Sequence, residues 1–115
     1  MAARFVGAYR LREKREFDRL YREGRRSSDN YFLALTCNNV LTHARLGISV
    51  PARAVGNAVN RNRIKRIIRE SFRVNVHRIP SIDVVVNARS SAKAAANAVL
   101  VRSLEGLWDK LARHA

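Results

Sequence analysis

The spacing of the hydrophobic residues changes along the chain, and the first regular spacing predicts a short helix. Between residues 13 and 24, Phe17, Leu20 and Tyr21 recur about one helical turn apart, while arginines occupy the opposite side. This amphipathic pattern is typical of a helix that lies on a core. Gly24 stands where a glycine commonly ends a helix.

Two apolar runs with strand-like character follow. Residues 31–37 are rich in aromatic and aliphatic side chains, two asparagines come next, and residues 46–50 form a second run that ends at Pro51. Asparagine pairs favour turns, and a proline commonly ends a strand. We therefore expect the two runs to pair as a β-hairpin.

A helical period returns at residue 57. The side chains that fall on one stripe of this helix are Ile64, Ile67, Ile68, Ser71 and Phe72. Most of the remaining circumference is basic, with Glu70 as the one acidic residue between Arg61 and Arg73. The segment predicts a long helix with one face in the core and a basic outer face.

The rest of the chain predicts a buried strand and a last helix. Three successive valines within 82–88 indicate a strand that is buried on both faces, and the helix before it indicates a strand-helix-strand crossover. Residues 94–113 predict an amphipathic helix with Asn97 or Ser91 as its N-cap. Its expected core residues are Val101, Leu104, Leu107, Trp108 and Leu111. These elements and the chain length predict one domain over 1–115, a sheet with basic helices around it, with 1–8 as a flexible N-terminal segment.

The net charge of the chain and its position along the sequence indicate a binding protein. The chain has 115 residues, 47% of them hydrophobic, and 23 Lys and Arg against 9 Asp and Glu, which gives a net charge of +14. So many apolar residues exclude a disordered basic tail. Residues 52–78 carry eight basic side chains and one acidic side chain, whereas 27–51 carry one of each. Half of the excess therefore lies on the long helix and the residues just before it.

A helix face with one sign of charge indicates a polyanionic partner. Guanidinium and ammonium groups at i, i+4 and i+8 can follow successive phosphates. A solvated helix normally mixes both signs at these spacings, so solvation alone explains this face poorly. We expect Asn57 and Asn60 to start the helix, and Asn62, set among the arginines, to contact phosphate or ribose.

The aromatic pair of the first helix has two readings. Phe17 and Tyr21 could stack on unpaired bases, but an aromatic pair is more often part of a core, and this favours the core for Phe17. For Tyr21, whose hydroxyl prefers a wet edge, the two readings stay equal.

The sequence contains no recognisable motif for catalysis by protein side chains. His43, His77 and His114 are far apart, and Cys37 has no cysteine partner for a disulfide or a zinc site. No nucleophile elbow or phosphate loop occurs. We find neither a secretory signal nor a membrane-spanning run, and we expect a cytoplasmic protein.

The long helix carries a motif that resembles the signature of the bacterial ribonuclease P protein subunit. The matching residues are Ala58-x-x-Arg61-Asn62-Arg63-Ile64-Lys65-Arg66-x-Ile68-Arg69-Glu70. Shorter matches occur in the family's order, at Tyr21-Arg22-Glu23-Gly24-Arg25-Arg26, at Arg45-Leu46-Gly47-Ile48-Ser49-Val50 and at Asp83-Val84-Val85-Val86. The resemblance covers most of the chain.

The resemblance implies an α+β sandwich in the order helix, three strands, helix, strand, helix, with a left-handed crossover (ribosomal protein S5 domain 2-like). It also implies a subunit of an endoribonuclease that removes the 5′ leader from precursor tRNA. The catalyst would be the RNA subunit, with Mg²⁺ held by that RNA and the substrate. The protein would have no catalytic residue, no cofactor, no membrane partner and no obligate protein partner.

The resemblance further implies two RNA-binding surfaces. The surface for the RNA subunit would consist of Arg53, Arg61, Asn62, Arg63, Lys65, Arg66 and Arg69. The cleft for the single-stranded leader would consist of Phe17, Tyr21, Arg12, Leu33 and Leu35. Two features depart from the family: Pro51-Ala52-Arg53 stands where relatives have two adjacent lysines, and Leu33 and Leu35 stand where some relatives have aromatic residues. We expect a third strand between the hairpin and the long helix.

Two other classes compete with this interpretation. A non-enzymatic RNA-binding or ribosome-binding module would need the same basic face. A helix-turn-helix DNA-binding protein is disfavoured, because no second short helix with a turn accompanies the basic helix.

Overall fold

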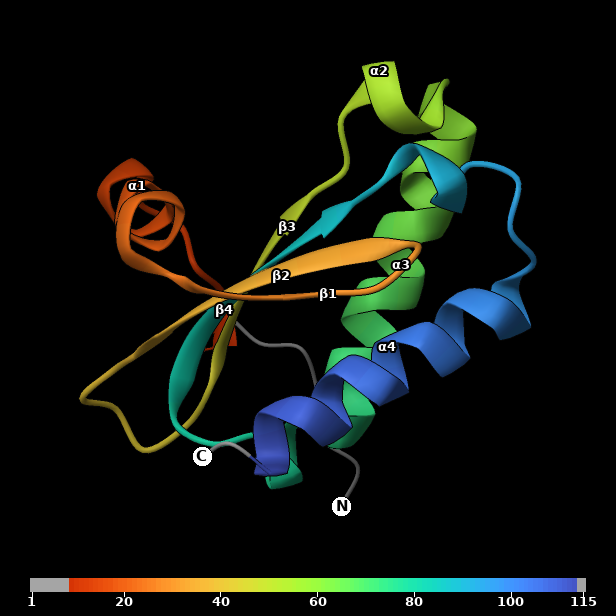
Figure 1. Ribbon diagram of the computed structural model, residues 1–115. Coiled ribbons are helices and arrows are strands. Elements are labelled where there is room, and N and C mark those ends of the chain that lie inside the picture. The colour runs from red at the N-terminus through yellow and green to blue at the C-terminus, as the bar shows by residue number, and fades with distance from the viewer. Residues whose placement is uncertain (1–8, 114–115) are drawn as a thin grey trace.

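The computed structural model describes residues 9–113, so the flexible segment expected at 1–8 lies outside the described residues. Figure 1 shows a twisted sheet with helices on both of its faces. The elements are α1 (Lys14–Glu23), β1 (Arg25–Ser28), β2 (Phe32–Asn38), β3 (Arg45–Ser49), α2 (Ala52–Val55), α3 (Ala58–Asn75), η2 (Val76–Arg78), β4 (Ile82–Ala88), η3 (Ser90–Ala92) and α4 (Asn97–Arg113). This order agrees with the α+β fold that we expected.

The sheet has the strand order β1-β2-β4-β3. β4 pairs antiparallel with β2 and parallel with β3, so it separates the two runs that were expected to form a hairpin. That expectation is wrong, and the hairpin that does form joins β1 to β2. The extra strand therefore precedes the two runs and does not follow them. β1 escaped detection because its four residues, two arginines and two serines, carry no apolar signal.

The central strand β4 explains this arrangement. Val84, Val85 and Val86 are each fully buried, as the valine run predicted. Val84 and Val86 belong to the main core, which α3 and α4 cover, whereas Val85 faces α1 together with Leu20 and Leu35. A strand with two apolar faces is stable only between two covering layers. β3, α3 and β4 thus form the expected crossover between neighbouring parallel strands.

An aromatic pair and a buried hydrogen bond lie among the contacts between the two long helices. Trp108 is fully buried, as expected, and its ring meets the Phe72 ring edge-on with centroids 5.9 Å apart. Its indole Nε1 donates to the Ser71 hydroxyl at 2.8 Å, which explains a serine on the apolar stripe. One expected core residue is misplaced: Val101 is exposed, and its neighbour Leu100 is buried instead.

Helix α1 packs on the opposite face and is tied to the sheet by charge. Leu20 lies in the small core beneath it. Arg45 of β3 binds the Glu16 carboxylate at 2.7 Å and the buried Asp83 carboxylate at 2.8 Å. One guanidinium thus compensates a buried charge and holds the helix in place, and removal of Arg45 would take the ion-pair partner from both carboxylates.

The glycine after α1 is required for space. Gly24 ends the helix as predicted, and its N–H donates to the Leu20 carbonyl at 2.8 Å. Its φ is −65°, so it does not adopt the left-handed conformation that usually favours glycine. A Cβ at this position would lie 2.3 Å from the Leu20 carbonyl oxygen, which is too close for any side chain.

The expected helix caps are partly correct. Asn57 caps α3, because its side chain accepts from the Asn60 N–H at 3.0 Å. For α4, both candidate caps are wrong. The helix begins at Asn97 itself, whose side chain accepts from Arg63, and Ser91 donates to the Asn30 carbonyl. Neither Asn97 nor Ser91 therefore caps the backbone N–H groups at the start of α4.

The Glu16 carboxylate predicts a pH dependence of stability. Burial raises its pKa, but hydrogen bonds from the Glu13 and Arg12 N–H groups and the charge of Arg45 lower the pKa, and the net value lies below the ordinary 4.5. A lowered pKa contributes stability above pH 4.5 that is lost as the pH falls through the folded-state value. Urea unfolding of Glu16→Gln at several pH values should show that its deficit against the wild type shrinks below pH 4.5. A deficit independent of pH would contradict this assignment.

Candidate nucleic-acid interface

The basic side chains of α3 do not form one continuous face. According to their position on the helix, some of these side chains lie beside the edge of β3, one contacts the loop before α4, and others are exposed to solvent. Arg61, Lys65 and Arg69 recur at i, i+4 and i+8, so they form one row along the helix. The Arg61 Nε donates to the Val50 carbonyl at 3.0 Å, just beyond the end of β3. This row therefore follows the free edge of β3.

The Arg63 guanidinium forms hydrogen bonds within the protein. Its guanidinium donates to Asn60 Oδ1 at 2.9 Å and to Asn97 Oδ1 at 2.7 Å. It also reaches the carbonyls of Ala95 at 3.1 Å and of Lys93 at 3.2 Å. Arg63 therefore fastens the loop between η3 and α4 to α3. Its place in the expected RNA-binding set is not favoured by this geometry, because the donors that would meet a phosphate are already used.

Asn60 completes the same fastening. Its amide Nδ2 donates to the Val55 carbonyl at 2.6 Å and to the Lys93 carbonyl at 3.1 Å. Asn60 lies within the helix and joins three segments, so the helix-start role expected for it belongs to Asn57 alone. A polar residue at this position is explained by the loop carbonyls that it satisfies.

Four of the residues expected to bind the RNA subunit are open to solvent. Asn62, Arg66 and Arg69 are exposed on α3, and Arg53 is exposed on the short helix α2. Farther along α3, Glu70 is paired with Arg73, so the acid of the motif neutralises a neighbouring base. A partner could reach these exposed side chains, and their role in binding stays a prediction.

The expected leader cleft is only partly open. Phe17 packs on the backbone of Gly47, where a Cβ would lie 2.6 Å from the ring. Tyr21 is 52% exposed, and its hydroxyl bonds the Asn87 side chain at 2.5 Å. Asn87 in turn donates to the Leu33 carbonyl at 3.2 Å. Tyr21 is therefore held over the sheet with its ring at the surface.

The other cleft residues differ in access. Leu33 is half-buried and Arg12 is exposed. Leu35 is only 4% exposed, because it lies in the small core under α1. Leu35 therefore cannot contact a ligand directly, and its inclusion in the cleft is wrong.

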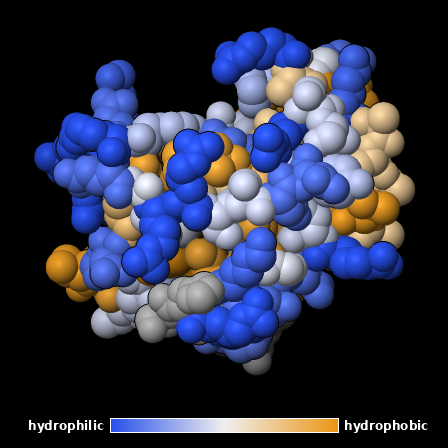
Figure 2. All heavy atoms as spheres, in the orientation of Figure 1, coloured by the Kyte–Doolittle hydropathy of each residue, from blue (hydrophilic) through white to orange (hydrophobic). Residues whose placement is uncertain are grey.

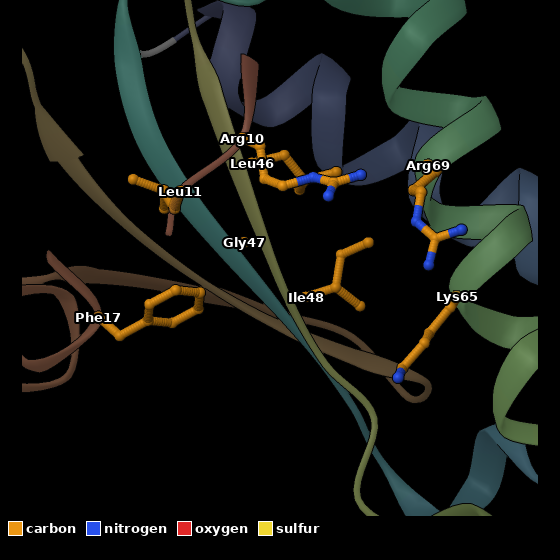
Figure 3. A pocket seen from close by; sticks show the side chains of 8 residues that line it. All are labelled: Arg10, Leu11, Phe17, Leu46, Gly47, Ile48, Lys65 and Arg69. Atoms are coloured by element: carbon orange, nitrogen blue, oxygen red, sulfur yellow. The ribbon is translucent and has the colours of Figure 1, made fainter. Parts of the chain in front are cut away.

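A pocket of about 220 Å³ joins the two expected surfaces. We call it the edge pocket, and it is lined by Arg10, Leu11, Phe17, Leu46, Gly47, Ile48, Lys65 and Arg69. In Figure 3, Lys65 and Arg69 extend from α3 on one side of β3, and Phe17 lies on the other side. Sequence reasoning missed Arg10, Gly47 and Ile48, because their role depends on which strand forms the sheet edge.

The surface formed by the described residues is strongly cationic. Figure 2 shows long hydrophilic side chains over much of one face, with apolar patches between them. Within residues 9–113, no group of three or more His, Cys, Asp or Glu side chains could hold a metal ion. Burial raises the pKa of the Cys37 thiol, which disfavours a reactive thiolate. No helix in the described range is long and apolar enough to cross a membrane.

The fold and this surface define a small basic α+β protein whose long arginine-rich helix lies beside a sheet edge. Known proteins with this sequence pattern give the family. The sequence model of the family Ribonuclease P matches residues 5–112. The ribonuclease P protein component of Methylococcus capsulatus is 41% identical over 95% of this chain and 85% of its own. The chain belongs to the ribonuclease P protein family.

Solved structures agree with this assignment. The RNase P protein of Staphylococcus aureus superimposes with a TM-score of 0.83 at 41% identity and covers 88% of this chain and 93% of its own. The Thermotoga maritima RNase P protein gives a TM-score of 0.78 at 34% identity and covers 88% of this chain and 96% of its own. The expected α+β fold is therefore confirmed.

Arg63 gives a prediction that separates structure from binding. Arg63→Ala should destabilise the protein by about 2–3 kcal/mol, because several carbonyl and amide acceptors lose a charged donor. Arg66→Ala, at an exposed position of the same helix, should change stability by less than about 0.5 kcal/mol. Urea unfolding of both variants measures the difference. Equal stabilities for the two variants would show that the loop does not depend on Arg63.

Proposed function

We propose that this protein is the protein component of a ribonuclease P ribonucleoprotein that removes the 5′ leader from precursor tRNA. In this function it binds the catalytic RNA subunit and the single-stranded leader, while the RNA hydrolyses the phosphodiester bond. The observation that carries the proposal is the family's arginine-rich motif, present on an α3 that leaves Asn62 and Arg66 exposed.

The proposal assigns the outer side of α3 to the RNA subunit. Asn62 and Arg66, one turn apart on α3, and the exposed Arg53 of α2 supply amide and guanidinium donors at the surface. Such groups bind phosphate and ribose without reading base sequence. Release of condensed counterions from the RNA would drive the association and make it sensitive to salt. The net charge of +14 supports a partner of this kind.

The leader is assigned to the sheet face beside α1. Tyr21 presents an exposed ring next to the half-buried Leu33. Aromatic rings bind unpaired bases with little sequence preference. With leucines in place of aromatic residues on β2, fewer rings are available for stacking, and packing and charge would contribute more.

Magnesium enters this proposal through the RNA. The described carboxylates form no cluster suited to a divalent cation, and Glu16, Glu70 and Asp83 are each paired with an arginine. The ions would therefore be held by the RNA subunit and the substrate. The protein would lower the concentration of magnesium that the RNA needs by supplying positive charge close to the phosphates.

Reconstitution tests the proposed function. The protein combined with the ribonuclease P RNA of its source should cleave precursor tRNA at magnesium concentrations where that RNA alone is nearly inactive. Cleavage no faster than that of the RNA alone, over a range of salt and magnesium, would refute the proposal. Recovery of ribosomal RNA in place of ribonuclease P RNA from cells would then favour a non-enzymatic RNA-binding module.

The exposed arginine of α3 gives a prediction for RNA-subunit binding. Arg66→Ala should weaken binding of the RNA subunit. It should also make the negative slope of log K against log salt less steep by about 0.7–0.9, the effect of one lost phosphate contact. Filter binding at several salt concentrations measures both quantities. Arg102→Ala, an exposed arginine on α4, is the matched control and should leave the slope unchanged. An unchanged slope for Arg66→Ala would exclude a direct phosphate contact.

The ring of Tyr21 gives a prediction for leader binding. Tyr21→Leu should weaken binding of leader-bearing substrate to the holoenzyme by about 1–3 kcal/mol, because one base loses a stacking partner. Tyr21→Phe keeps the ring and loses only the bond to Asn87, so it should retain most of the affinity. Competition binding with leaderless tRNA controls for other contacts. If Tyr21→Leu binds leader-bearing substrate as tightly as wild type, the ring does not stack on the leader.

A further inference from the structure

The outer edge of β1 is free, because β1 is the last strand on its side of the sheet. In the hairpin, the Asp29 N–H donates to the Phe32 carbonyl at 3.0 Å, so the Asp29 N–H faces β2. Backbone groups of alternate residues in a strand point to the same edge. The N–H of Ser27 therefore also faces β2, and the N–H of Arg26 points outward.

The free edge of β1 borders a hollow of about 260 Å³. We call it the β1 pocket, and it is lined by Arg25, Arg26, Ser27, Lys110 and Leu111. Ser27 lies opposite Ala34, which belongs to the main core, so Arg25 and Ser27 lie on the sheet face that α4 covers. Lys110 comes from the last turn of α4, and Figure 1 shows this helix beside β1, which it contacts. Two elements thus contribute to one hollow.

The three cations of the β1 pocket have no acidic partner. Within residues 9–113, Arg25, Arg26 and Lys110 form no ion pair and no side-chain hydrogen bond, and all three are exposed. Every basic side chain of α1, by contrast, pairs with a nearby carboxylate. Asp109, which precedes Lys110, is paired with Arg78. The positive charge of the β1 pocket is therefore not neutralised by the residues around it.

Two structural roles explain part of this charge. Charged side chains on an edge strand discourage pairing with another chain, and a lysine in the last turn of a helix is favoured by the helix dipole. Each role concerns one element alone. Neither requires side chains of β1 and α4 to line the same hollow beside a free N–H group. A ligand with negative charge accounts for both the convergence and the free donor.

The lining of the β1 pocket suits the backbone of a base-paired RNA. Cationic side chains, a hydroxyl and a free N–H are groups that bind phosphate. The apolar residue of the lining, Leu111, is only 9% exposed, so the pocket offers no ring or apolar face to an unpaired base. A base-paired RNA presents phosphates and riboses outward and needs no such face. The four-residue edge of β1 is also short for pairing with a peptide strand.

We propose that the β1 pocket binds one phosphate of a base-paired RNA, with the Arg26 N–H and the side chains of Arg25, Ser27 and Lys110 as donors. This site lies at the opposite edge of the sheet from β3, so it is separate from the basic row of α3. The proposal rests on the proposed function for the identity of the RNA, and it adds a further contact surface to that function.

Binding of phosphate to the free protein is the first test. In ¹H–¹⁵N correlation spectra recorded during titration with inorganic phosphate at constant ionic strength, the Arg26 amide proton should move downfield and saturate. The Ser27 amide, which points to β2, should move much less. Arg25→Gln should weaken this binding about two- to fivefold, the effect of one lost exposed charge. Arg102→Gln, at an exposed arginine of α4 outside the pocket, is the matched control and should not weaken it.

A short RNA hairpin separates the site from an adventitious ion. It should shift the Arg26 amide at a lower concentration than inorganic phosphate does. An Arg26 amide that responds to neither ligand would overturn the proposal. A response to phosphate alone would also overturn it, because it would reveal an adventitious ion only.

A glutamate-rich peptide tests whether the edge of β1 takes a protein strand instead. An acidic strand paired with β1 would move the two outward amides, those of Arg26 and Ser28, together. The hairpin should bind more tightly than this peptide at the same ionic strength. Tighter binding of the peptide, with both amides shifted, would overturn the proposal.

The holoenzyme identifies which RNA supplies the phosphate, with Arg25→Gln and Lys110→Gln combined in one variant. If this variant binds the RNA subunit more weakly, that RNA supplies the phosphate. If it binds precursor tRNA and leaderless tRNA more weakly to the same extent, the tRNA supplies it. Weaker binding of the leader-bearing precursor alone, or no loss of affinity, would overturn the proposal while the wild-type holoenzyme is active. An inactive wild-type holoenzyme would instead refute the proposed function, so the two failures are distinct.

Discussion

The rest of the structure depends on the burial of β4 on both faces and along both edges. Its three successive valines require an apolar layer above and below the sheet, and strands on either side must satisfy its backbone groups. β2 and β3 therefore lie on opposite sides of it, although they are consecutive in the sequence. This placement leaves β3 at the edge of the sheet, next to α3, and it creates the position where the two candidate binding surfaces meet.

The charge distribution follows from how few acids are available and where they are used. Arg45 joins Glu16 of α1 to the buried Asp83 of β4, so two acids stabilise the interior side of the fold. Asp109 on α4 binds Arg78 near the end of α3 at 2.5 Å. Acids committed to such pairs cannot neutralise the remaining bases. The positive excess is therefore left on the outer side of α3 and around the edge of β3, where a polyanion can reach it.

Much of the fold was predictable from local pattern. The apolar stripe placed α3, the valine run placed β4 at its observed bounds, and the spacing of leucines located α4 to within a few residues. The pairing of the strands was not predictable in this way, because a hairpin between consecutive strands is the usual arrangement and no residue of β2 or β3 records that β4 will lie between them. The four-residue strand β1 has no apolar residue to reveal it.

The sequence by itself determined the family, the strongly basic character of α3 and the residues that could meet a phosphate, because these depend on residue type and helical spacing. Only the tertiary structure decided how each one is used. Arg63 has the same chemistry as Arg66, yet one guanidinium lies among the carbonyls of the loop before α4 and the other lies in solvent. Leu35 is removed from the surface in the same way by the packing of α1. Neighbours distant in sequence fix these roles, because hydrogen bonding and burial act through space.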